Sequence, residues 1–300
     1  MPIHSAFLKY FNEVRRCGSI RLAARKLYVA SSAVNRQILK IEDELDVKLF
    51  ERSASGIRLT PAGELLAQHI SRTLADAERT LADIAALKHS ARLVITIAGQ
   101  ESVIARFLPP ALMELHAESP DISTVFKAAG GIQLQELLLA GSADIALAFD
   151  PEPNNLIKQV ATIQLPVGAV MTPAHPLAGR ATVALADCTP FPIVLPDQSW
   201  PLRELLDHEI EKAGLSPTII TSSNSVEFLK AMVDQQLGIG FQTIIGIETH
   251  VGNGELRHIA LVDSKPVQQK FALCVRTDRL HAPVIQRVLD LLKKRLDDYR

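Results

Sequence analysis

Four side chains that can read nucleic-acid bases stand together in the stretch "SSAVNR" (31–36). They are Ser31, Ser32, Asn35 and Arg36. An asparagine amide can pair with adenine through a bidentate hydrogen bond, an arginine can pair with guanine in the same way, and a serine hydroxyl can contact several bases. Apolar residues spaced three or four apart over 34–45 predict that this stretch opens a helix with exposed first turns. The pattern indicates a helix that reads bases.

Basic residues surround this stretch, and five of them are candidates for phosphate or minor-groove contacts. They are Arg21, Arg25, Lys40, Arg52 and Arg58. Residues 1–60 carry eleven Lys and Arg against six Asp and Glu, a local charge of +5 that leaves −6 for residues 61–300. Any one of these cations could be an ordinary solvated side chain. The cluster as a whole favours a polyanionic partner such as double-stranded DNA.

Two short helices joined by a tight turn would position these residues. The pattern predicts a first helix that Gly18 ends, a second helix capped by Ser19, and a third helix after a turn at 28–30. Two helices separated by about three residues match a helix-turn-helix. Ser and Gly within 50–60 predict a turn between two short strands, as in a two-stranded wing.

A long helix is predicted over 61–88, with Thr60 as its cap and Pro61 at its first position. Its apolar stripe alternates between spacings of three and four and consists of Ala67, Ile70, Leu74, Ala77, Leu81 and Ile84. A helix that lies only on its own domain normally has a wider apolar face, whereas a stripe this narrow is typical of packing against a partner helix. We therefore expect a homodimer held by Ile70, Leu74, Ala77, Leu81 and Ile84.

After residue 90 the pattern alternates between strands and helices, which indicates an α/β fold with open, parallel-type sheets. Strands are expected at 92–98, 122–127, 144–149, 167–172, 191–195, 218–221, 238–242 and 270–276. Helices are expected at 103–117, 132–140, 202–213, 226–236 and 282–298. This region is long for one such sheet, so we expect two subdomains.

Ligands of open α/β sheets bind beyond the carboxyl ends of the strands, where helix N-termini present free amides. Four segments fit that description: "GQES" (99–102), "AGG" (129–131), "PDQSW" (196–200) and "TSSN" (221–224). The candidate ligand-binding residues are Gln100, Ser102, Gly131, Ser199, Trp200 and Ser222. Hydroxyls and amides suit a small polar or anionic molecule. Alternatively, Ser102 and Ser222 cap helices and Trp200 belongs to the core.

The first third of the chain resembles the winged helix-turn-helix of LysR-type transcriptional regulators. The resemblance runs almost position by position over 7–66, in "GSI..AA..L", "SAVNRQI..IEDELDVKLFER" and "RLTPAGE". The segments "ITIAGQESVIARFLPPAL", "LLLAGSADIALAF" and "KAMVDQQLGIGF" resemble the family's effector domain more loosely. The resemblance implies a sequence-specific DNA-binding transcriptional regulator, modulated by a small-molecule effector that binds between two C-terminal subdomains.

The resemblance also implies the domain organisation. A winged helix-turn-helix would occupy 1–60, a linker helix 61–90, and a periplasmic-binding-protein-like effector domain 91–300. Subdomain I would comprise 91–162 and 267–300 and subdomain II 163–266, with the chain crossing between them near 161–164 and 264–268. Family members are commonly dimers of dimers, so a homotetramer is expected.

One departure from the family lies at the base-reading surface. Where the family usually has Ser, Gln and Ser, this chain has Ala30, Ser31 and Asn35. Alanine has no side-chain acceptor, so we expect Ser31 to cap the third helix instead. The operator sequence need not follow the family's most familiar one.

Other classes of function lack their motifs here. The chain has no phosphate loop, HExxH, CxxC or GxSxG, and its nine histidines form no pair four residues apart. Cys17, Cys188 and Cys274 suit buried apolar positions better than a disulfide or zinc site. We expect no enzyme activity, no cofactor or metal, no membrane segment and a cytoplasmic location. A stand-alone solute-binding protein would share the later fold but would need a signal peptide and would lack the basic module.

Overall fold

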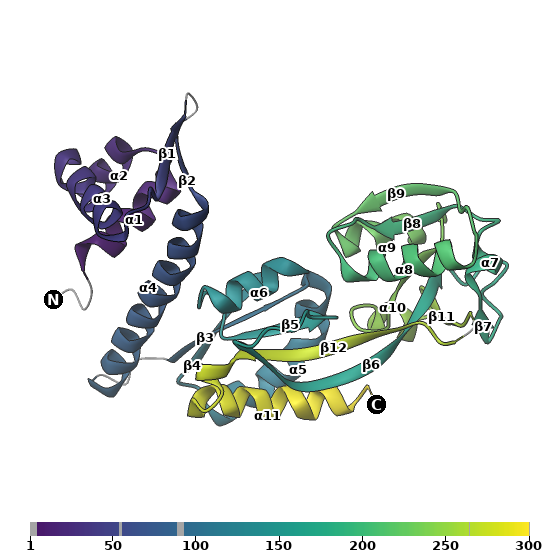
Figure 1. Cartoon of the computed structure of the whole chain (residues 1–300). Coiled ribbons are helices and arrows are strands. Elements are labelled where there is room, and N and C mark those ends of the chain that lie inside the picture. The colour runs from purple at the N-terminus through teal and green to yellow at the C-terminus, as the bar shows by residue number, and fades with distance from the viewer. Residues whose placement is uncertain (1–4, 54–55, 89–92, 264, 300) are drawn as a thin grey trace. The chain divides into compact units, whose positions relative to one another are not determined.

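The computed structural model describes residues 5–53, 56–88, 93–263 and 265–299, and within them the side chains of all residues except 52–53, 78–79, 82–83 and 85–88. The chain divides into two compact units. The first unit comprises Met1–Leu93 with Leu139–Ser142, and the second comprises Val94–Leu138 with Ala143–Arg300. Figure 1 labels the elements of both units in chain order.

The first unit has the expected helix-turn-helix, wing and long helix. Its elements are α1 (Ala6–Cys17), α2 (Ile20–Lys26), α3 (Ser31–Leu45), β1 (Phe50–Ser53), β2 (Gly56–Leu59) and α4 (Pro61–Lys88). Strands β1 and β2 pair antiparallel, with Phe50 opposite Leu59. The predicted winged helix-turn-helix is confirmed.

Local signals explain where these helices begin and end. Gly18 ends α1 in the left-handed conformation (φ 59°), which costs glycine little. The Ser19 hydroxyl then accepts the N–H of Leu22 at 3.4 Å and caps α2. The Thr60 hydroxyl caps α4 by accepting the N–H of Gly63 at 3.0 Å. Both predicted caps are confirmed.

The core of the first unit draws on all four helices. Its fully buried members are Phe7, Phe11, Val14, Ala23, Ala24, Val34, Ile38, Leu49, Ala67 and Ile70. The start of α4 approaches the backbone so closely that a Cβ on Gly63 would lie 2.1 Å from the carbonyl oxygen of Leu49. The first half of α4 is therefore part of this core.

The second unit alternates strands and helices as expected. Its elements are β3 (Leu93–Gly99), α5 (Glu101–Glu118), β4 (Ile122–Ala128), α6 (Ile132–Leu139), β5 (Ile145–Phe149), β6 (Ile157–Met171), β7 (Thr182–Val183), α7 (Leu185–Cys188), β8 (Ile193–Pro196), α8 (Pro201–Lys212), β9 (Ile219–Ser223), α9 (Val226–Asp234), β10 (Gly240–Thr243), α10 (Glu248–Gly252), β11 (Arg257–Leu261), β12 (Gln268–Arg276), a 3₁₀ turn (Thr277–Arg279) and α11 (Pro283–Asp297). Every predicted strand and helix has a counterpart. The short elements β7, α7 and α10, the strand β11 and the first ten residues of β6 were not predicted.

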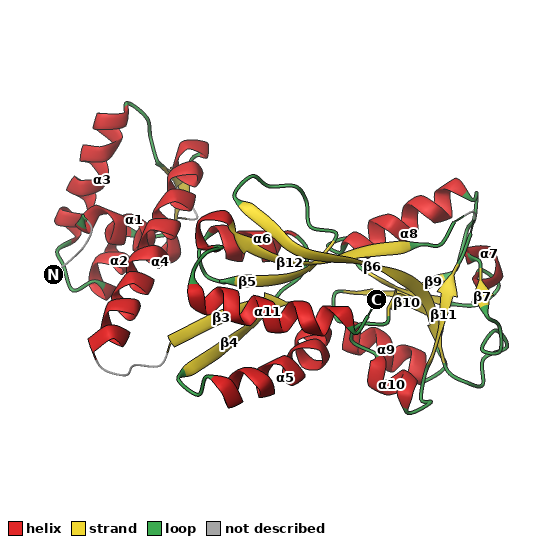
Figure 2. Ribbon diagram, turned by 90° about the horizontal axis from the view of Figure 1, so that it is seen from below, coloured by secondary structure: helices red, strands yellow, loops and turns green. Residues whose placement is uncertain are grey.

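The main sheet is mixed, whereas parallel-type sheets were expected. Its strand order is β4-β3-β5-β12-β6-β11-β7, and β10 also pairs with β6. Strands β3 and β5 are parallel, but β12 is antiparallel to both of its neighbours, β5 and β6. The reason is topological: the chain leaves along β6 and returns along β12, so these long strands run in opposite directions (Figure 2).

Strands β6 and β12 connect two lobes of the second unit. The first lobe contains β3, β4, β5, α5, α6 and α11, and the second contains β7 to β11 and α7 to α10. Strand β6 pairs with β12 up to Pro166 and with β10 from Val167 onward. Strand β6 thus changes its pairing partner a few residues beyond 161–164, where the chain was expected to cross between subdomains. Residues 161–164 themselves lie inside the continuous strand β6. The return strand β12 begins at Gln268, close to the expected second crossing.

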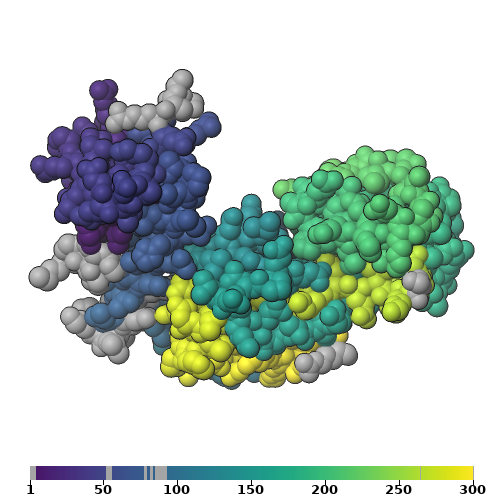
Figure 3. Space-filling model, in the orientation of Figure 1, coloured from purple at the N-terminus to yellow at the C-terminus, as the bar shows by residue number. Residues whose placement is uncertain are grey.

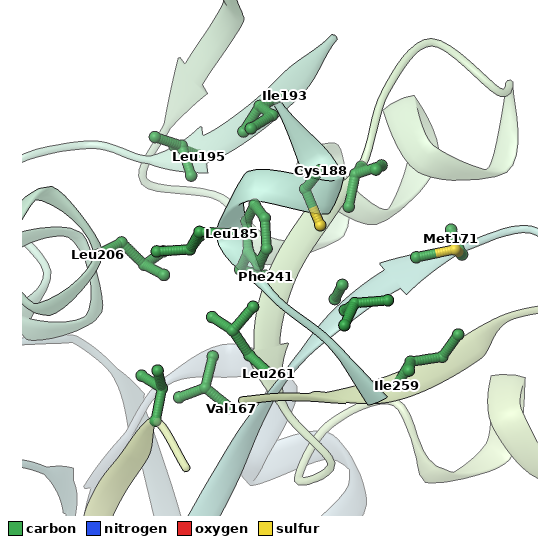
Figure 4. Close-up of a cluster of buried hydrophobic side chains, with 14 of the residues drawn as sticks. Val167, Met171, Leu185, Cys188, Ile193, Leu195, Leu206, Phe241, Ile259 and Leu261 are labelled. Atoms are coloured by element: carbon green, nitrogen blue, oxygen red, sulfur yellow. The ribbon is translucent and has the colours of Figure 1, made fainter. Parts of the chain in front are cut away.

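Each lobe has its own apolar core. In the second lobe, side chains from β6, α7, β8, α8, β10 and β11 converge (Figure 4). Cys188 belongs to this cluster and Cys274 to the core of the first lobe, and burial raises the pKa of both thiols to about 12. Their prediction as buried apolar residues is confirmed, whereas Cys17 is only partly buried.

Candidate functional site

The start of α3 presents polar side chains because the opposite face of the helix is buried. Val34 and Ile38 belong to the core of the first unit. The other side of the helix carries the four predicted base-reading residues: Ser31, Ser32, Asn35 and Arg36. Asn35 is partly exposed and the other three are exposed. All four can therefore meet a molecule that covers the first two turns of α3.

The cap of α3 differs from the expectation. Ala30 is the N-cap, and no side chain accepts a hydrogen bond from the first amides of the helix. Ser31 does not replace it, because the helix already begins at Ser31 and the residue is therefore one position too late to act as a cap. The first amides of α3 are left to solvent or to a bound group.

Three of the five predicted backbone-contacting cations are exposed and form no ion pair with any described carboxylate: Arg21 and Arg25 on α2, and Arg58 on β2. Lys40 is also exposed, but its ammonium lies 3.6 Å from the Glu44 carboxylate on the same helix. The side chain of Arg52 lies outside the described residues. An exposed ion pair of this kind is weak, so Lys40 can still reach an anion.

The predicted dimerisation stripe on α4 divides into two parts. Ile70 is fully buried and Leu74 packs against the same core, so these two residues stabilise the first unit itself. Ile70 is therefore corrected: it cannot contact a partner helix while this core is intact. Ala77 is partly exposed, and Leu81 and Ile84 have 50% and 42% of their surface exposed.

A cavity of about 490 Å³ opens in the second unit between its two lobes. Figure 3 shows the notch where the teal surface of the first lobe meets the green surface of the second. The first lobe supplies Gln100, Glu101, Ser102, Ala128, Ala129, Gly130, Ile132 and Gln133, and the second supplies Gln198, Ser199, Trp200, Asn224, Ser225, Val226 and Glu227. Its size suits a small molecule.

Four helices begin at this cavity: α5, α6, α8 and α9. Gln100 and Trp200 occupy the N-cap positions of α5 and α8, and neither side chain accepts a hydrogen bond from its helix. Only Ser225, at the start of α9, caps its helix, by accepting the N–H of Phe228 at 3.3 Å. Uncapped N-termini leave amide donors and a favourable electrostatic potential for acceptor groups of a ligand.

The structure brings most of the predicted ligand-binding residues together. Gln100, Ser102, Ser199 and Trp200 all line the cavity. Gly131 lies next to the lining residue Gly130 and has φ +51°, and a Cβ there would meet the carbonyl oxygen of Ser199 at 2.6 Å. Gly131 therefore permits the close approach of two loops at the edge of the cavity and contributes no surface to it.

Ser222 is the exception among these predictions. It does not line the cavity, and its hydroxyl accepts a hydrogen bond from Arg203 at 3.2 Å. Arg203 extends from α8 and also donates to the carbonyl oxygen of Pro196. The Ser222 hydroxyl thus bonds to a side chain nineteen positions earlier in the sequence. A contact over that separation cannot be read from local sequence.

Six polar residues that line the cavity were not predicted from the sequence: Glu101, Gln133, Gln198, Asn224, Ser225 and Glu227. Two of them, Glu101 and Gln198, are immediate neighbours of predicted residues, and Asn224 lies within the segment 221–224.

Two polar side chains at the cavity are almost buried and lack partners. Gln100 and Ser102 have 7% and 4% of their surface exposed, and neither side chain hydrogen-bonds to a described residue. Behind Trp200, the buried Nε2 atom of Gln242 also has no described partner and faces two small hollows of about 30 and 20 Å³. The polar groups of Gln100 and Ser102 are thus free to bond to a molecule in the cavity, and Gln242 Nε2 is a buried donor that a ligand could pair.

The charged residues at the cavity wall are acidic. Glu101 and Glu227 line it, and its described lining contains no Lys or Arg. Lys230 lies behind this wall, buried, with its ammonium 2.6 Å from Glu227 and 3.4 Å from the carbonyl oxygen of Gly246. The side chains thus neither attract an anion nor exclude a positively charged group.

Within the described part of the chain, no three His, Cys, Asp or Glu residues are grouped so that they could hold a metal ion. None of the helices in the described residues is both long and apolar enough to cross a membrane. The arrangement at both candidate sites is one of hydrogen-bond donors, acceptors and charges suited to reversible binding.

Two protein-family profiles match the chain. Residues 6–64 match "Bacterial regulatory helix-turn-helix protein, lysR family", and residues 88–297 match "LysR substrate binding domain". Together they cover both candidate sites and most of the chain.

Similar proteins include regulators from several bacteria. The chain is 27% identical to the HTH-type transcriptional regulator CysB of Burkholderia cenocepacia over 80% of this chain and 78% of that protein. It is 29% identical to the transcriptional dual regulator GltC of Bacillus subtilis over 77% of this chain and 78% of that protein. Among solved structures, full-length OxyR from Pseudomonas aeruginosa superposes with a TM-score of 0.68 at 21% identity, covering 97% of this chain and 96% of that one. The LysR-family regulator CbnR superposes with a TM-score of 0.66 at 20% identity, covering 96% and 98%.

Proposed function

The chain belongs to the LysR family of bacterial regulatory helix-turn-helix proteins, and from this membership we propose that its α3 surface reads operator DNA while the cavity of its second unit binds the effector. It is a sequence-specific DNA-binding transcriptional regulator whose activity a small molecule modulates. The boundaries 1–60, 61–90 and 91–300 are part of the proposal. We place the protein in the cytoplasm because bacterial DNA lies there.

At the DNA, Asn35 and Arg36 contact base edges from the start of α3, with Ser31 and Ser32 beside them. Their exposure on the first two turns supports this role. Arg21, Arg25, Lys40 and Arg58 contact phosphates on either side, and Arg52 is proposed for the same role from its sequence position. Phosphate contacts fix the position of the protein on the duplex, and base contacts supply the specificity.

The observation that carries the effector proposal is the pair of unpartnered side chains, Gln100 and Ser102, at a cavity large enough for a small molecule. An effector with both donors and acceptors would satisfy them. The uncapped amides at the start of α5 suit an acceptor or carboxylate group of that molecule, and Glu101 suits a donor or an amine. We therefore favour a small polar molecule, neutral or zwitterionic, over a purely anionic one.

The assembly is proposed to be a dimer formed by the outer half of α4, where Leu81 and Ile84 are exposed. A dimer would place two α3 helices on successive half-sites of a partly palindromic operator. The further step to a dimer of dimers rests on the family resemblance alone.

A thermal-shift screen of metabolites against the full-length protein tests the effector proposal. An effector at a hundred times its dissociation constant should stabilise the protein by roughly 2.7 kcal/mol. The chain has one tryptophan, Trp200 at the cavity wall, so binding should also change its fluorescence saturably. Ser102→Ala should weaken binding of the effector about 2- to 12-fold, because it removes one hydrogen bond.

Ser222→Ala provides the matched control, because it removes the same hydroxyl from a nearby position outside the cavity. It should leave the affinity unchanged. Gln100→Leu should remove the ligand response and leave the stability of the free protein nearly unchanged, since the amide that it removes bonds to no described residue. If an effector bound wild-type, Ser102→Ala and Gln100→Leu proteins with equal affinity and left Trp200 emission unchanged, it would occupy another site.

A further inference from the structure

Tyr28 lies in the turn between α2 and α3, directly before the helix that carries the base-reading residues. Its N–H donates to the carbonyl oxygen of Arg25 at 3.3 Å, and the next N–H, of Val29, donates to Ala24 at 3.0 Å. This pair of bonds is a Schellman motif, in which the residue at the position of Tyr28 is left-handed. Its φ is indeed +55°.

A tyrosine is unfavourable at this position for two independent reasons. The left-handed conformation suits glycine or asparagine, whereas a bulky side chain there is strained. In addition, 96% of the surface of Tyr28 is exposed, the largest exposure among the large apolar or aromatic residues described. Its ring packs against no described aromatic ring, and its hydroxyl bonds to no described residue. Neither helix capping nor core packing therefore explains why the ring is there.

The surroundings of Tyr28 indicate what covers it. Arg25 precedes it by three residues and Ser31 follows it by three, and both are exposed. Arg25 forms no ion pair with a described carboxylate. In a helix-turn-helix bound to DNA, the start of the second helix enters the major groove, so the turn before it lies near the sugar-phosphate backbone at the groove edge.

We infer that Tyr28 contacts the DNA backbone beside the groove that α3 enters. Its phenol hydroxyl donates a hydrogen bond to a phosphate oxygen, and its ring covers the adjacent deoxyribose. The inference rests on the proposed reading of DNA by the start of α3. Because Tyr28 is neutral and touches no base, it strengthens specific and non-specific binding alike and releases no counterion.

This role predicts a combination of effects on stability, affinity and salt dependence that differs from that of a cation such as Arg25. Tyr28→Asn keeps a residue that tolerates the left-handed conformation but removes the ring and the phenol. The melting temperature of the first unit should rise by roughly 2–6 °C as strain is relieved. Affinity for duplex DNA of mixed sequence should fall about 5- to 20-fold, with the slope of log affinity against log salt unchanged. Arg25→Ala should instead lower the magnitude of that slope by about 0.9.

The experiment compares wild-type, Tyr28→Asn, Tyr28→Phe and Arg25→Ala full-length proteins by fluorescence anisotropy on mixed-sequence duplex DNA and by differential scanning calorimetry. Tyr28→Phe should bind with intermediate affinity at wild-type stability, since only the hydroxyl is lost. If Tyr28→Asn bound DNA with wild-type affinity, Tyr28 would have no role in DNA binding and the inference would be wrong. If Tyr28→Asn melted at a lower temperature than wild-type protein, the role of Tyr28 would be structural, which also overturns the inference. If wild-type protein fails to bind duplex DNA while remaining folded, the DNA-binding function itself is wrong, which is a different outcome.

Discussion

Asn35 and Arg58 illustrate how neighbouring residues on one surface are expected to act differently. Asn35 is a partly exposed amide on α3, and Arg58 is an exposed cation on the wing that pairs with no described carboxylate. An amide recognises a base by the geometry of its donors and acceptors, whereas a guanidinium near a phosphate acts mainly by charge. The two roles can be separated by salt and by sequence.

Asn35→Ala should weaken binding to the operator by about 1–3 kcal/mol and hardly change binding to unrelated DNA, because it removes a base contact without removing a charge. The operator can be obtained by selecting bound duplexes from a random pool. Arg58→Ala is the comparison: it should weaken both kinds of binding and make both less dependent on salt. Equal losses of specific and non-specific affinity in Asn35→Ala would mean that Asn35 does not read a base.

At the scale of elements, Glu42 connects the end of α3 to the start of the wing. Its carboxylate is buried and accepts the N–H groups of Leu49 and Phe50 at 2.9 and 3.3 Å, as well as the Lys48 ammonium at 2.8 Å. These bonds hold the first residues of β1 beside the end of α3. One ionised side chain therefore helps to fix the wing relative to the base-reading helix.

The stability of the first unit should depend on the ionisation of Glu42. Burial raises the pKa of this carboxyl, but the bonds from Lys48, Leu49 and Phe50 outweigh burial and leave the pKa below its ordinary value of 4.5. A lowered pKa stabilises the folded state above the ordinary value, and this contribution is lost as the pH falls from there through the folded-state pKa. Thermal melts between pH 6 and pH 3 should show a steeper loss for wild-type protein than for Glu42→Gln.

Glu42→Ala should cost about 2–3 kcal/mol at neutral pH, because two buried amides lose their acceptor. Glu44→Gln is the matched control, since Glu44 is an exposed carboxylate on the same helix whose only described ion pair is with Lys40. It should change stability by less than about 0.5 kcal/mol. If Glu42→Gln and wild-type protein lost stability in parallel on acidification, Glu42 would not be the group responsible.

At the scale of the whole molecule, operator binding depends on how many copies assemble. Leu81 and Ile84 continue the stripe of α4 beyond the core of their own unit and remain exposed in the single chain. Apolar side chains at this spacing gain stability by packing against the same stripe of a second copy. Two linked α3 helices bind two half-sites far more tightly than one helix binds one half-site.

Leu81→Glu combined with Ile84→Glu should give a folded monomer whose operator affinity falls at least about 100-fold. Analytical ultracentrifugation measures the assembly, and circular dichroism checks the fold. Leu65→Glu, on another face of the same helix and 71% exposed, should leave the assembly intact. A double variant that still sediments as a dimer would place dimerisation in the second unit.

Local chemistry determined much of this protein from the sequence alone. The caps Ser19 and Thr60, the stop at Gly18 and the apolar spacing of the helices act over a few residues, so the winged helix-turn-helix and most elements of the second unit could be predicted. The same holds for Gln100, Ser102, Ser199 and Trp200, because the ends of strands and the starts of helices are visible in the sequence and such ends meet in an α/β fold.

Tertiary packing decided between residues that look alike in the sequence. Ile70 and Leu81 belong to one stripe, yet only Ile70 is buried in the core that also contains Phe11 and Val34. Ser102 and Ser222 both follow strands predicted from the sequence, yet Arg203 donates a hydrogen bond only to Ser222. The mixed sheet arises because β12 returns beside β6 from a distant part of the chain. Each of these outcomes depends on contacts between segments far apart in sequence, which no local pattern of spacing, charge or capping can specify.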